Sequence, residues 1–323
     1  MHKVNYLQAV NEALYEEMER DERVFILGED VAWNLLGATG GLVERFGAER
    51  VRNTPISEAG FVGAAAGAAM VGMRPVVDIL IAPFLYVAMD QIVSIIAKST
   101  YLYGGQAQLP LVIRAPMLYG HGNAAQHSDR PYPTFMTVPG LKIIAPTTPA
   151  DAKGMLKTAI RDDDPVMCFE DAQVWGSTSE VPDDDLTIPL GEAAVLREGT
   201  DVTIVAVASA VPQATAAAER LEGDGVDAEV IDLRSIVPLD HATILASVAK
   251  TGRLVVADPA HRLGSVASEV AAIIAEDGFW DLAAPVVRVT TPHTHIPFSA
   301  PLERPLYPSA DRIAAAVGTV LES

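Results

Sequence analysis

Residues 53–69 read Asn-Thr-Pro-Ile-Ser-Glu-Ala-Gly-Phe-Val-Gly-Ala-Ala-Ala-Gly-Ala-Ala, a segment built almost wholly of small side chains. Such residues form tight turns and helices that lie close against a neighbouring strand or helix. Ser57 can cap this helix, and Glu58 in its first turn is favoured by the helix dipole. We also expect Glu58 to be buried among Ile56 and Phe61, and burial raises a carboxyl pKa and suits it to share a proton with a heterocyclic nitrogen. Glu58 is therefore either a helix-start device or the chemical group that the segment presents.

The composition indicates an ordinary globular protein. The chain has 323 residues, enough for two domains with separate cores, and half of them are apolar. Its formal net charge of −19 argues against a nucleic-acid or anionic-membrane surface, and fits a basic partner or simply a solubilising acidic surface. The single cysteine, Cys168, excludes a disulfide within the chain and a cysteine-based metal site, which suits a reducing cytoplasm.

Two apolar stretches raise the question of targeting or membrane insertion. Met1–Arg20 is predicted to form an amphipathic acidic helix rather than a signal peptide. The run Val76–Ala97 is long enough for a membrane span, but Asp78, Pro83 and Asp90 interrupt it. We therefore expect a strand, a turn and then a helix that begins near Tyr86.

Strands alternating with helices predict an α/β fold with two doubly wound domains. The pattern runs from a helix at Tyr6–Arg20 to a strand at Val166–Glu170 and restarts with a strand at Val202–Val207. Prolines and an acid run between them, within Gly176–Glu198, indicate a surface connection. The expected organisation is a first domain at 1–185, a linker at 186–198 and a smaller domain at 199–323.

Two loops could carry chemistry. Gly28-Glu29-Asp30 follows a strand, where open α/β sheets bind ligands, and Glu29 either reaches a ligand or braces the loop. The connection Met117–Pro139 is unusually long and contains His121 and His127. A histidine there could donate a proton or pair with a substrate carboxylate, although packing is the commoner role for a histidine taken alone. The chain lacks Gly-x-Gly-x-x-Gly, Walker A and Gly-x-Ser-x-Gly sequences.

Several motifs in one order carry a family resemblance over essentially the whole chain. They are Gly28-Glu29-Asp30-Val31, the 53–61 segment, Gly72-Met73-Arg74-Pro75-Val76, Asp90-Gln91-Ile92, Gln126-His127-Ser128, Pro139-Gly140-Leu141-Lys142 and Ile231-Asp232-Leu233-Arg234-Ser235. The chain resembles the β subunit of the thiamine-diphosphate-dependent E1 component of 2-oxo-acid dehydrogenase complexes. The resemblance implies a transketolase-like pyrimidine-binding domain followed by a transketolase C-terminal domain.

The resemblance also implies partners and residue roles. The family forms an α2β2 heterotetramer, in which the α subunit holds Mg²⁺ and the diphosphate and the β subunit contacts the aminopyrimidine. Glu58 matches the glutamate that hydrogen-bonds the pyrimidine N1′, and Phe84 matches the aromatic residue on that ring; Glu29 lies among the cofactor-binding positions. His127 matches the histidine implicated in passing the acyl unit from a small 2-oxo acid to the lipoyl group of E2.

By the same resemblance, a structural monovalent cation, K⁺, is implied near the turn 162–164. Its expected ligands are Asp162 and Asp164 with Leu109, Leu111, Val112 and Ala159. Without the resemblance, Asp162–Asp164 reads as a solvated turn.

Three segments depart from the family pattern: the shortened loop Ala32–Gly40, the Asp129–Pro133 sequence after His127-Ser128, and a C-terminal segment with His293 and His295. The favoured function is a dehydrogenase acting on pyruvate, a related 2-oxo acid or acetoin. The loop changes keep open a stand-alone transketolase-like or acyloin-forming carboligase. A non-catalytic subunit that docks E2 is the third alternative.

Overall fold

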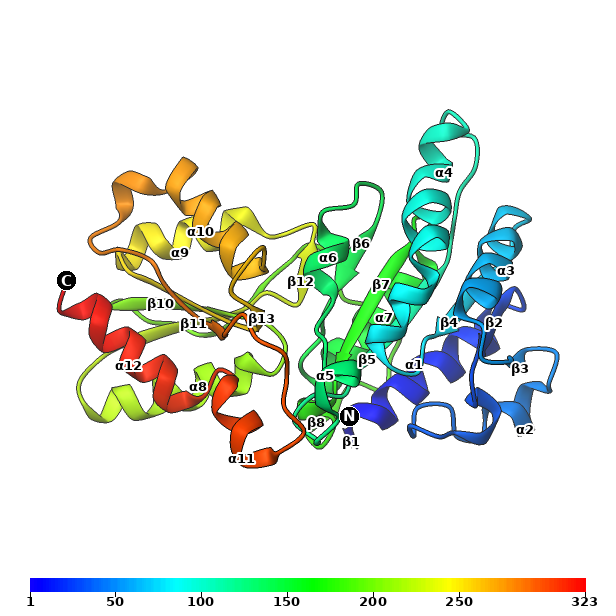
Figure 1. Ribbon diagram of the computed structural model, residues 1–323, viewed down its shortest axis with the longest axis horizontal. Coiled ribbons are helices and arrows are strands. Elements are labelled where there is room, and N and C mark those ends of the chain that lie inside the picture. The colour runs from blue at the N-terminus through cyan, green and yellow to red at the C-terminus, as the bar shows by residue number, and fades with distance from the viewer. The chain divides into compact units, whose positions relative to one another are not determined.

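The computed structural model describes all 323 residues, which form two compact units. The first comprises Met1–Leu118 and Thr134–Leu190, and the second comprises Tyr119–Pro133 and Gly191–Ser323 (Figure 1). Residues 119–133 thus belong with the C-terminal unit, although the chain on both sides of them belongs to the first. Of the predicted linker 186–198, residues up to Leu190 belong to the first unit and the remainder to the second.

Six strands of the first unit lie side by side and parallel, in the order β3-β2-β4-β5-β7-β6. Their bounds are β2 Val24–Gly28, β3 Val51–Asn53, β4 Arg74–Asp78, β5 Val112–Met117, β6 Lys142–Ile144 and β7 Val166–Asp171. A separate antiparallel pair joins β1 (His2–Asn5) to β8 (Thr178–Val181). Because parallel strands end at the same edge, Gly28, Asp78 and the end of β7 share one edge of the sheet.

Helices cover both faces of this sheet. Helix α1 (Tyr6–Arg20) packs on α7 (Pro149–Arg161), and both contribute to one core with the strands. Helix α3 (Glu58–Met70) packs on β2 and β4. The remaining elements are η1 Val31–Trp33, α2 Leu42–Phe46, η2 Ala82–Ala88, η3 Gln91–Ile96, α4 Ala97–Leu102, α6 Tyr132–Met136 and η4 Ala172–Val174.

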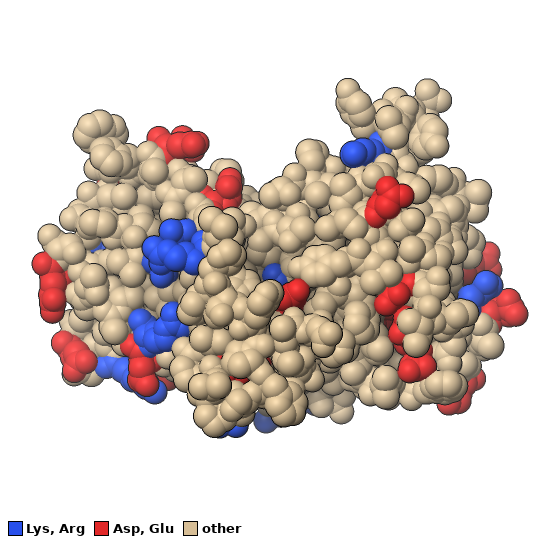
Figure 2. All heavy atoms as spheres, in the orientation of Figure 1, with Lys and Arg blue, Asp and Glu red and all other residues tan.

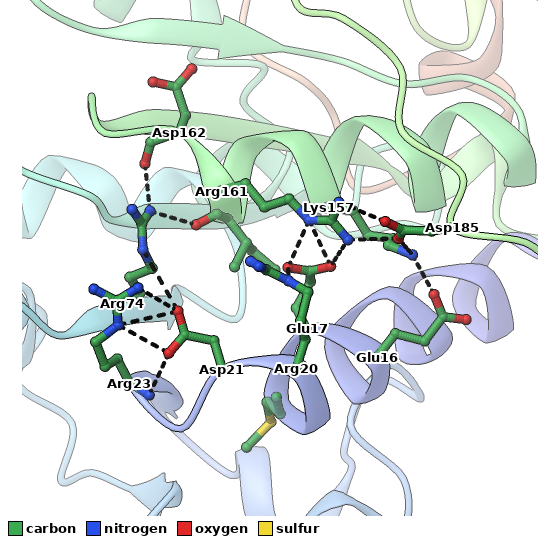
Figure 3. Close-up of polar contacts among 12 residues, drawn as sticks. Glu16, Glu17, Arg20, Asp21, Arg23, Arg74, Lys157, Arg161, Asp162 and Asp185 are labelled. Carbon is green, nitrogen blue, oxygen red and sulfur yellow. Dashed lines mark hydrogen bonds and ion pairs between the residues drawn. The ribbon is translucent and has the colours of Figure 1, made fainter.

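A network of ion pairs joins α1 to α7 (Figure 3). Glu17 is fully buried and accepts hydrogen bonds from Arg20 Nε at 2.9 Å and from Arg161 Nε at 3.0 Å. Asp185 pairs with Lys157 Nζ and Arg161 Nη2, each at 2.6 Å, and these cations hold the pKa of its carboxyl well below the usual range. Asp185 therefore pairs with these two cations while its own side chain stays exposed, so the acid run lies at the surface as predicted.

The second unit contains a five-stranded sheet in the order β14-β13-β10-β11-β9, in which only β9 is antiparallel to its neighbour. Helices α8 and α12 share one core with its strands, and α9 and α10 pack on β10 and β13 respectively. The bounds are α5 Ala124–His127, β9 Ala194–Arg197, β10 Val202–Ala206, α8 Ala210–Gly223, β11 Ala228–Asp232, β12 Ser235–Val237, α9 His241–Thr251, β13 Leu254–His261, α10 Val266–Asp277, η5 Phe279–Asp281, β14 Val287–Thr291, α11 Ala300–Glu303, η6 Arg304–Leu306 and α12 Ala310–Leu321.

The predicted α/β class is confirmed, and the predicted helix Tyr6–Arg20 has the observed bounds. Three local predictions are wrong. Residues 2–5 form β1 instead of continuing the N-terminal helix, because they pair with β8. The helix expected from Tyr86 is instead a 3₁₀ segment, a π segment and the short α4. The connection Gly176–Glu198 contains β8 and β9, whose pairing partners are distant in sequence.

The charged side chains are dispersed over the face shown in Figure 2, where Lys and Arg occur in small groups among large uncharged areas. The run Val76–Ala97 is divided among β4, η2, η3 and the first residue of α4. Each helix in the structure is too short or too polar to cross a membrane.

Gly28 marks a close approach of two strands at the edge that carries Glu29. A Cβ at Gly28 would lie 2.3 Å from the main-chain carbonyl oxygen of Asp78, whereas a Cβ at Gly67 in α3 would meet nothing within 4 Å. We expect Gly28→Ala to lower the free energy of unfolding by about 1–3 kcal/mol, as overpacking does. Gly67→Ala should raise it by about 0.5–1 kcal/mol, since alanine favours a helix interior.

Denaturant unfolding of the two variants beside the wild type measures both effects. Equal stability of Gly28→Ala and the wild type would show that the strands can separate without cost.

Candidate active site

Glu29 lies directly after β2 and is 8% exposed. Burial raises the pKa of its carboxyl, and the neighbouring carboxylates of Glu58 and Asp30 raise it further. Its Oε1 atom is buried and has no hydrogen-bond partner. Glu29 lines a shallow pocket with Leu35, Leu36 and Thr39, among others, from the shortened loop. An acid held in this way is suited to a polar ligand group rather than to bracing its own loop.

The shortened loop around this pocket is held by its own side chains. Thr39 Oγ1 donates to the Val31 carbonyl at 2.6 Å, and the amide of Thr39 donates to Asn34 Oδ1 at 2.8 Å. Asn53 Oδ1 accepts from the amide of Ala32 at 2.8 Å. The loop is therefore fixed to the end of β3, beside the segment that leads to Glu58.

Glu58 is the first residue of α3 and is 6% exposed. Ser57 occupies the N-cap position, but its side chain makes no capping hydrogen bond, so the predicted cap is wrong. No hydrogen bond or ion pair within the chain engages the Glu58 carboxylate, and its charge acts on Glu29. The structure therefore brings these two acids together, one at a strand end and one at a helix start.

A buried arginine joins three strands below this edge. Arg114 on β5 is 1% exposed, and its Nη1 donates to Asp78 Oδ2 at 2.7 Å. Its Nε and Nη2 donate to the two carboxylate oxygens of Glu170 on β7, at 2.7 and 2.9 Å. Burial alone would lower the pKa of Arg114, but the two carboxylates outweigh it and raise the pKa. The other Asp78 oxygen accepts from the amide of Leu80, which has a positive φ of 63°.

Phe84 lies in η2 and is half-buried, and η2 packs against α3. It therefore belongs to the same unit as Glu29 and Glu58. His127 is the last residue of α5 and is also half-buried, but it belongs to the second unit.

The predicted cation ligands lie together at the turn after α7, and they have partners within the chain. Lys142 Nζ lies 2.8 Å from Asp162 Oδ2 and 3.0 Å from Asp164 Oδ2. Hydrogen bonds occupy the carbonyl oxygens of Leu109, Leu111, Ala159 and Asp162, and Val112 belongs to β5. The Lys142 ammonium thus pairs with both carboxylates and offsets one of their two negative charges, so the turn is not simply solvated.

The segment 119–133 is fastened to the second unit by buried carboxylates. Glu303 is fully buried and accepts from the amides of Gly120 at 2.7 Å and Gly122 at 3.2 Å. Asp258 is also fully buried and accepts from the Tyr132 hydroxyl at 2.5 Å. Burial raises the pKa of both Asp258 and Tyr132, which keeps the tyrosine protonated as the donor.

Sequence reasoning missed Arg114, Glu170 and the two carboxylates that fasten the loop. A signal existed for Arg114 and Glu170, because charged residues interrupt otherwise apolar strands, and a buried charge requires a partner. No local signal connects Asp258 or Glu303 to residues 119–133, because each contact spans more than a hundred residues.

The comparison with known proteins agrees with this arrangement. Residues 2–175 match the transketolase pyrimidine binding domain, and residues 191–313 match the transketolase C-terminal domain. A solved structure described as a split gene transketolase, inactive β4 tetramer, superposes with a TM-score of 0.82. It is 26% identical and the match covers 99% of this chain and 98% of that one. The fold and the site thus define a transketolase-type protein with two α/β domains.

Relatives of closely similar length specify the family. The acetoin:2,6-dichlorophenolindophenol oxidoreductase β subunit of Bacillus subtilis is 44% identical, over 97% of this chain and 95% of that one. The 2-oxoisovalerate dehydrogenase β subunit of the same organism is 43% identical over the whole of both chains. The pyruvate dehydrogenase E1 β subunit of Rickettsia felis is 42% identical over 98% of both. The chain belongs to the family of β subunits of thiamine-diphosphate-dependent E1 components.

The residues present fit the pyrimidine part of thiamine diphosphate. Glu58 offers a buried carboxyl that no group of the chain engages, and Glu29 offers a buried oxygen without a partner. A nitrogen heterocycle with hydrogen-bond donors could satisfy both acids, which otherwise only repel each other.

The raised pKa of Glu29 predicts that the folding stability of the wild type depends on pH. Between the ordinary glutamate pKa and the raised value, the native state binds more protons than the unfolded chain, so the wild type loses stability as pH rises. Glu29→Gln removes this loss. We expect the midpoint of thermal unfolding of Glu29→Gln, relative to that of the wild type, to rise as pH increases above about 4 and to level off above the raised pKa.

Calorimetry at several pH values measures this difference between the two midpoints. Glu44→Gln is the matched control, because Glu44 is an exposed acid in the first turn of α2. A difference that falls with rising pH would contradict the prediction.

Proposed function

We propose that this chain is the β subunit of an E1 enzyme that works with an α subunit and thiamine diphosphate on pyruvate, a related 2-oxo acid or acetoin. The relatives named for acetoin, pyruvate and 2-oxoisovalerate support this range of substrates. The observation that carries the proposal is the buried, unengaged carboxyl of Glu58 beside the raised-pKa acid Glu29. We assign Mg²⁺ and the diphosphate to the α subunit.

Glu58 would hold the proton at N1′ of the aminopyrimidine. Its carboxyl is buried at the start of α3 and pairs with no other group of the chain, so a ring nitrogen would supply the hydrogen-bond partner that it lacks. A carboxyl within hydrogen-bond reach of that nitrogen is placed to act as a general acid–base group.

Phe84 would pack on the pyrimidine ring, since it is half-buried on an element that contacts α3. Thiamine diphosphate, when bound, supplies the electron sink that allows the bond next to the 2-oxo carbon to break. His127 would donate or accept the proton when the acyl unit passes to a lipoyl group on E2. The Arg114 ion pairs fix the ends of β4, β5 and β7, beside the strand end that carries Glu29.

Replacing Glu58 tests the assignment directly. In the assembled enzyme, Glu58→Gln should lower kcat by about 10²–10⁴-fold with each 2-oxo acid, because it removes the proton partner but preserves size. A decarboxylation assay with an artificial electron acceptor measures this. Glu44→Gln, a first-turn glutamate on α2, should leave kcat unchanged.

Wild-type turnover in the Glu58→Gln variant would refute the catalytic assignment. A wild-type enzyme that binds the cofactor and turns over no 2-oxo acid or acetoin would shift the proposal to carbon–carbon ligation.

The proposal for K⁺ is specific to the turn 162–164. A potassium ion there would have to displace Lys142, whose pKa is raised by hydrogen bonds to Asp162 and Asp164 against the effect of burial. In Lys142→Met we therefore expect thermal stability to rise in KCl relative to tetramethylammonium chloride of equal ionic strength. The wild type should show little difference between the salts. Equal stability of the variant in both would remove K⁺ from the proposal.

A further inference from the structure

Arg130 fastens the main chain beside His127 to the second unit. Its Nη1 donates to the carbonyl oxygen of Ser128 at 2.5 Å, and Ser128 directly follows His127 at the end of α5. Its Nε donates to the carbonyl oxygen of Pro259 on β13 at 2.9 Å. One guanidinium therefore connects the histidine-bearing loop to a strand 129 residues further along the chain.

Two aromatic rings hold the same guanidinium. The Arg130 Cζ atom lies 4.9 Å from the ring centroid of Tyr119 and 5.3 Å from that of Tyr307. The two rings also contact each other, with centroids 4.8 Å apart. Arg130 is 4% exposed, so its charge is largely removed from water and its orientation is set by these contacts. Lysine could not replace it, because an ammonium lacks the planar fork that serves two carbonyls and two rings.

The surroundings make this contact rigid. Tyr307 donates to Glu303 at 2.8 Å, and Glu303 also accepts from the amide of Gly120 at the start of the loop. At the other end, Tyr132 is held by Asp258. The segment 119–133 is thus fixed before, at and after the position of Arg130.

We propose that Arg130 is a positioning residue for His127, which it places for acyl transfer by tying the Ser128 carbonyl to β13. This inference rests on the proposed function, since it assigns His127 to the transfer step. It gives the C-terminal unit a part in that step, and it assigns a role to Arg130, one of the residues at which this chain departs from the family pattern.

The test separates two half-reactions of the assembled enzyme. Arg130→Met should lower reductive acylation of a free lipoyl domain by about 10–100-fold, as small displacements of a reacting group do. Turnover of the 2-oxo acid with an artificial electron acceptor should stay within about threefold of the wild type, because that reaction does not need the transfer step. His127→Gln provides the reference for complete loss of the transfer function.

Two further variants test whether the loss of acyl transfer comes from losing the hydrogen bonds and ring contacts of Arg130. Arg130→Lys should show the same separation of the half-reactions as Arg130→Met, since charge alone does not reproduce the fork. Arg197→Met is the matched control: Arg197 Nε also donates to a carbonyl oxygen of the second unit, that of Ala228 at 3.1 Å, on strands away from the loop. It should leave both half-reactions unchanged.

Hydrogen exchange of the same assembled variants provides a readout independent of activity. Peptides from 119–130 should exchange faster in Arg130→Met than in Arg197→Met, while peptides from the sheet of the second unit remain protected.

The inference is overturned if both half-reactions fall in parallel, if neither changes, or if Arg130→Lys is fully active. A wild-type enzyme that turns over the artificial acceptor but never acylates the lipoyl domain would instead refute the proposed acceptor. Hydrogen exchange then tests whether Arg130 anchors the loop. Unchanged exchange in Arg130→Met overturns this anchoring role, and faster exchange confined to residues 119–130 supports it.

Discussion

The candidate site depends on a positive charge placed inside a sheet. Arg114 is removed from water between Asp78 and Glu170, and the three residues come from adjacent strands of the first unit. A buried pair of this kind gives little net stability, yet loss of one partner leaves a charge without compensation and costs about 3–5 kcal/mol. The Arg114 ion pairs therefore act mainly on geometry, because they fix the relative positions of three strand ends. The neighbouring strand end carries Glu29, and the helix packed on these strands begins with Glu58.

Glu29 and Glu58 are neighbouring acids with like charge. Burial and the neighbouring charge of Glu58 act against the ionised form of Glu29, and no cation of the chain relieves it. Elsewhere in the same unit, buried acids such as Glu17 are matched with arginines. Glu17 thus has its partners within the chain, whereas the proposed function gives Glu29 and Glu58 a partner from outside it.

Local sequence predicted most of this arrangement, and the failures share one physical reason. Helices with a clear apolar periodicity, such as Tyr6–Arg20, were predictable because their boundary signals lie within a few residues. Glu58 could be singled out because one carboxylate stands in a small-residue segment. The strands β1, β8 and β9 could not be predicted from local sequence, because such short strands are defined by pairing partners far along the chain. The attachment of residues 119–133 to the second unit could not be predicted either, because it depends on the carboxylates of Asp258 and Glu303.

The placement of residues 119–133 has a consequence for synthesis of the protein. Tyr132 emerges from the ribosome 126 residues before Asp258, and Gly120 emerges 183 residues before Glu303. At about 5–20 residues per second, the loop waits some 6–37 seconds for its anchors. During that time Tyr132 lacks Asp258, and Arg130 lacks both the Pro259 carbonyl and the Tyr307 ring. The first unit can build its sheet in this interval, but the loop that bears His127 becomes fixed only when the last part of the chain has been made.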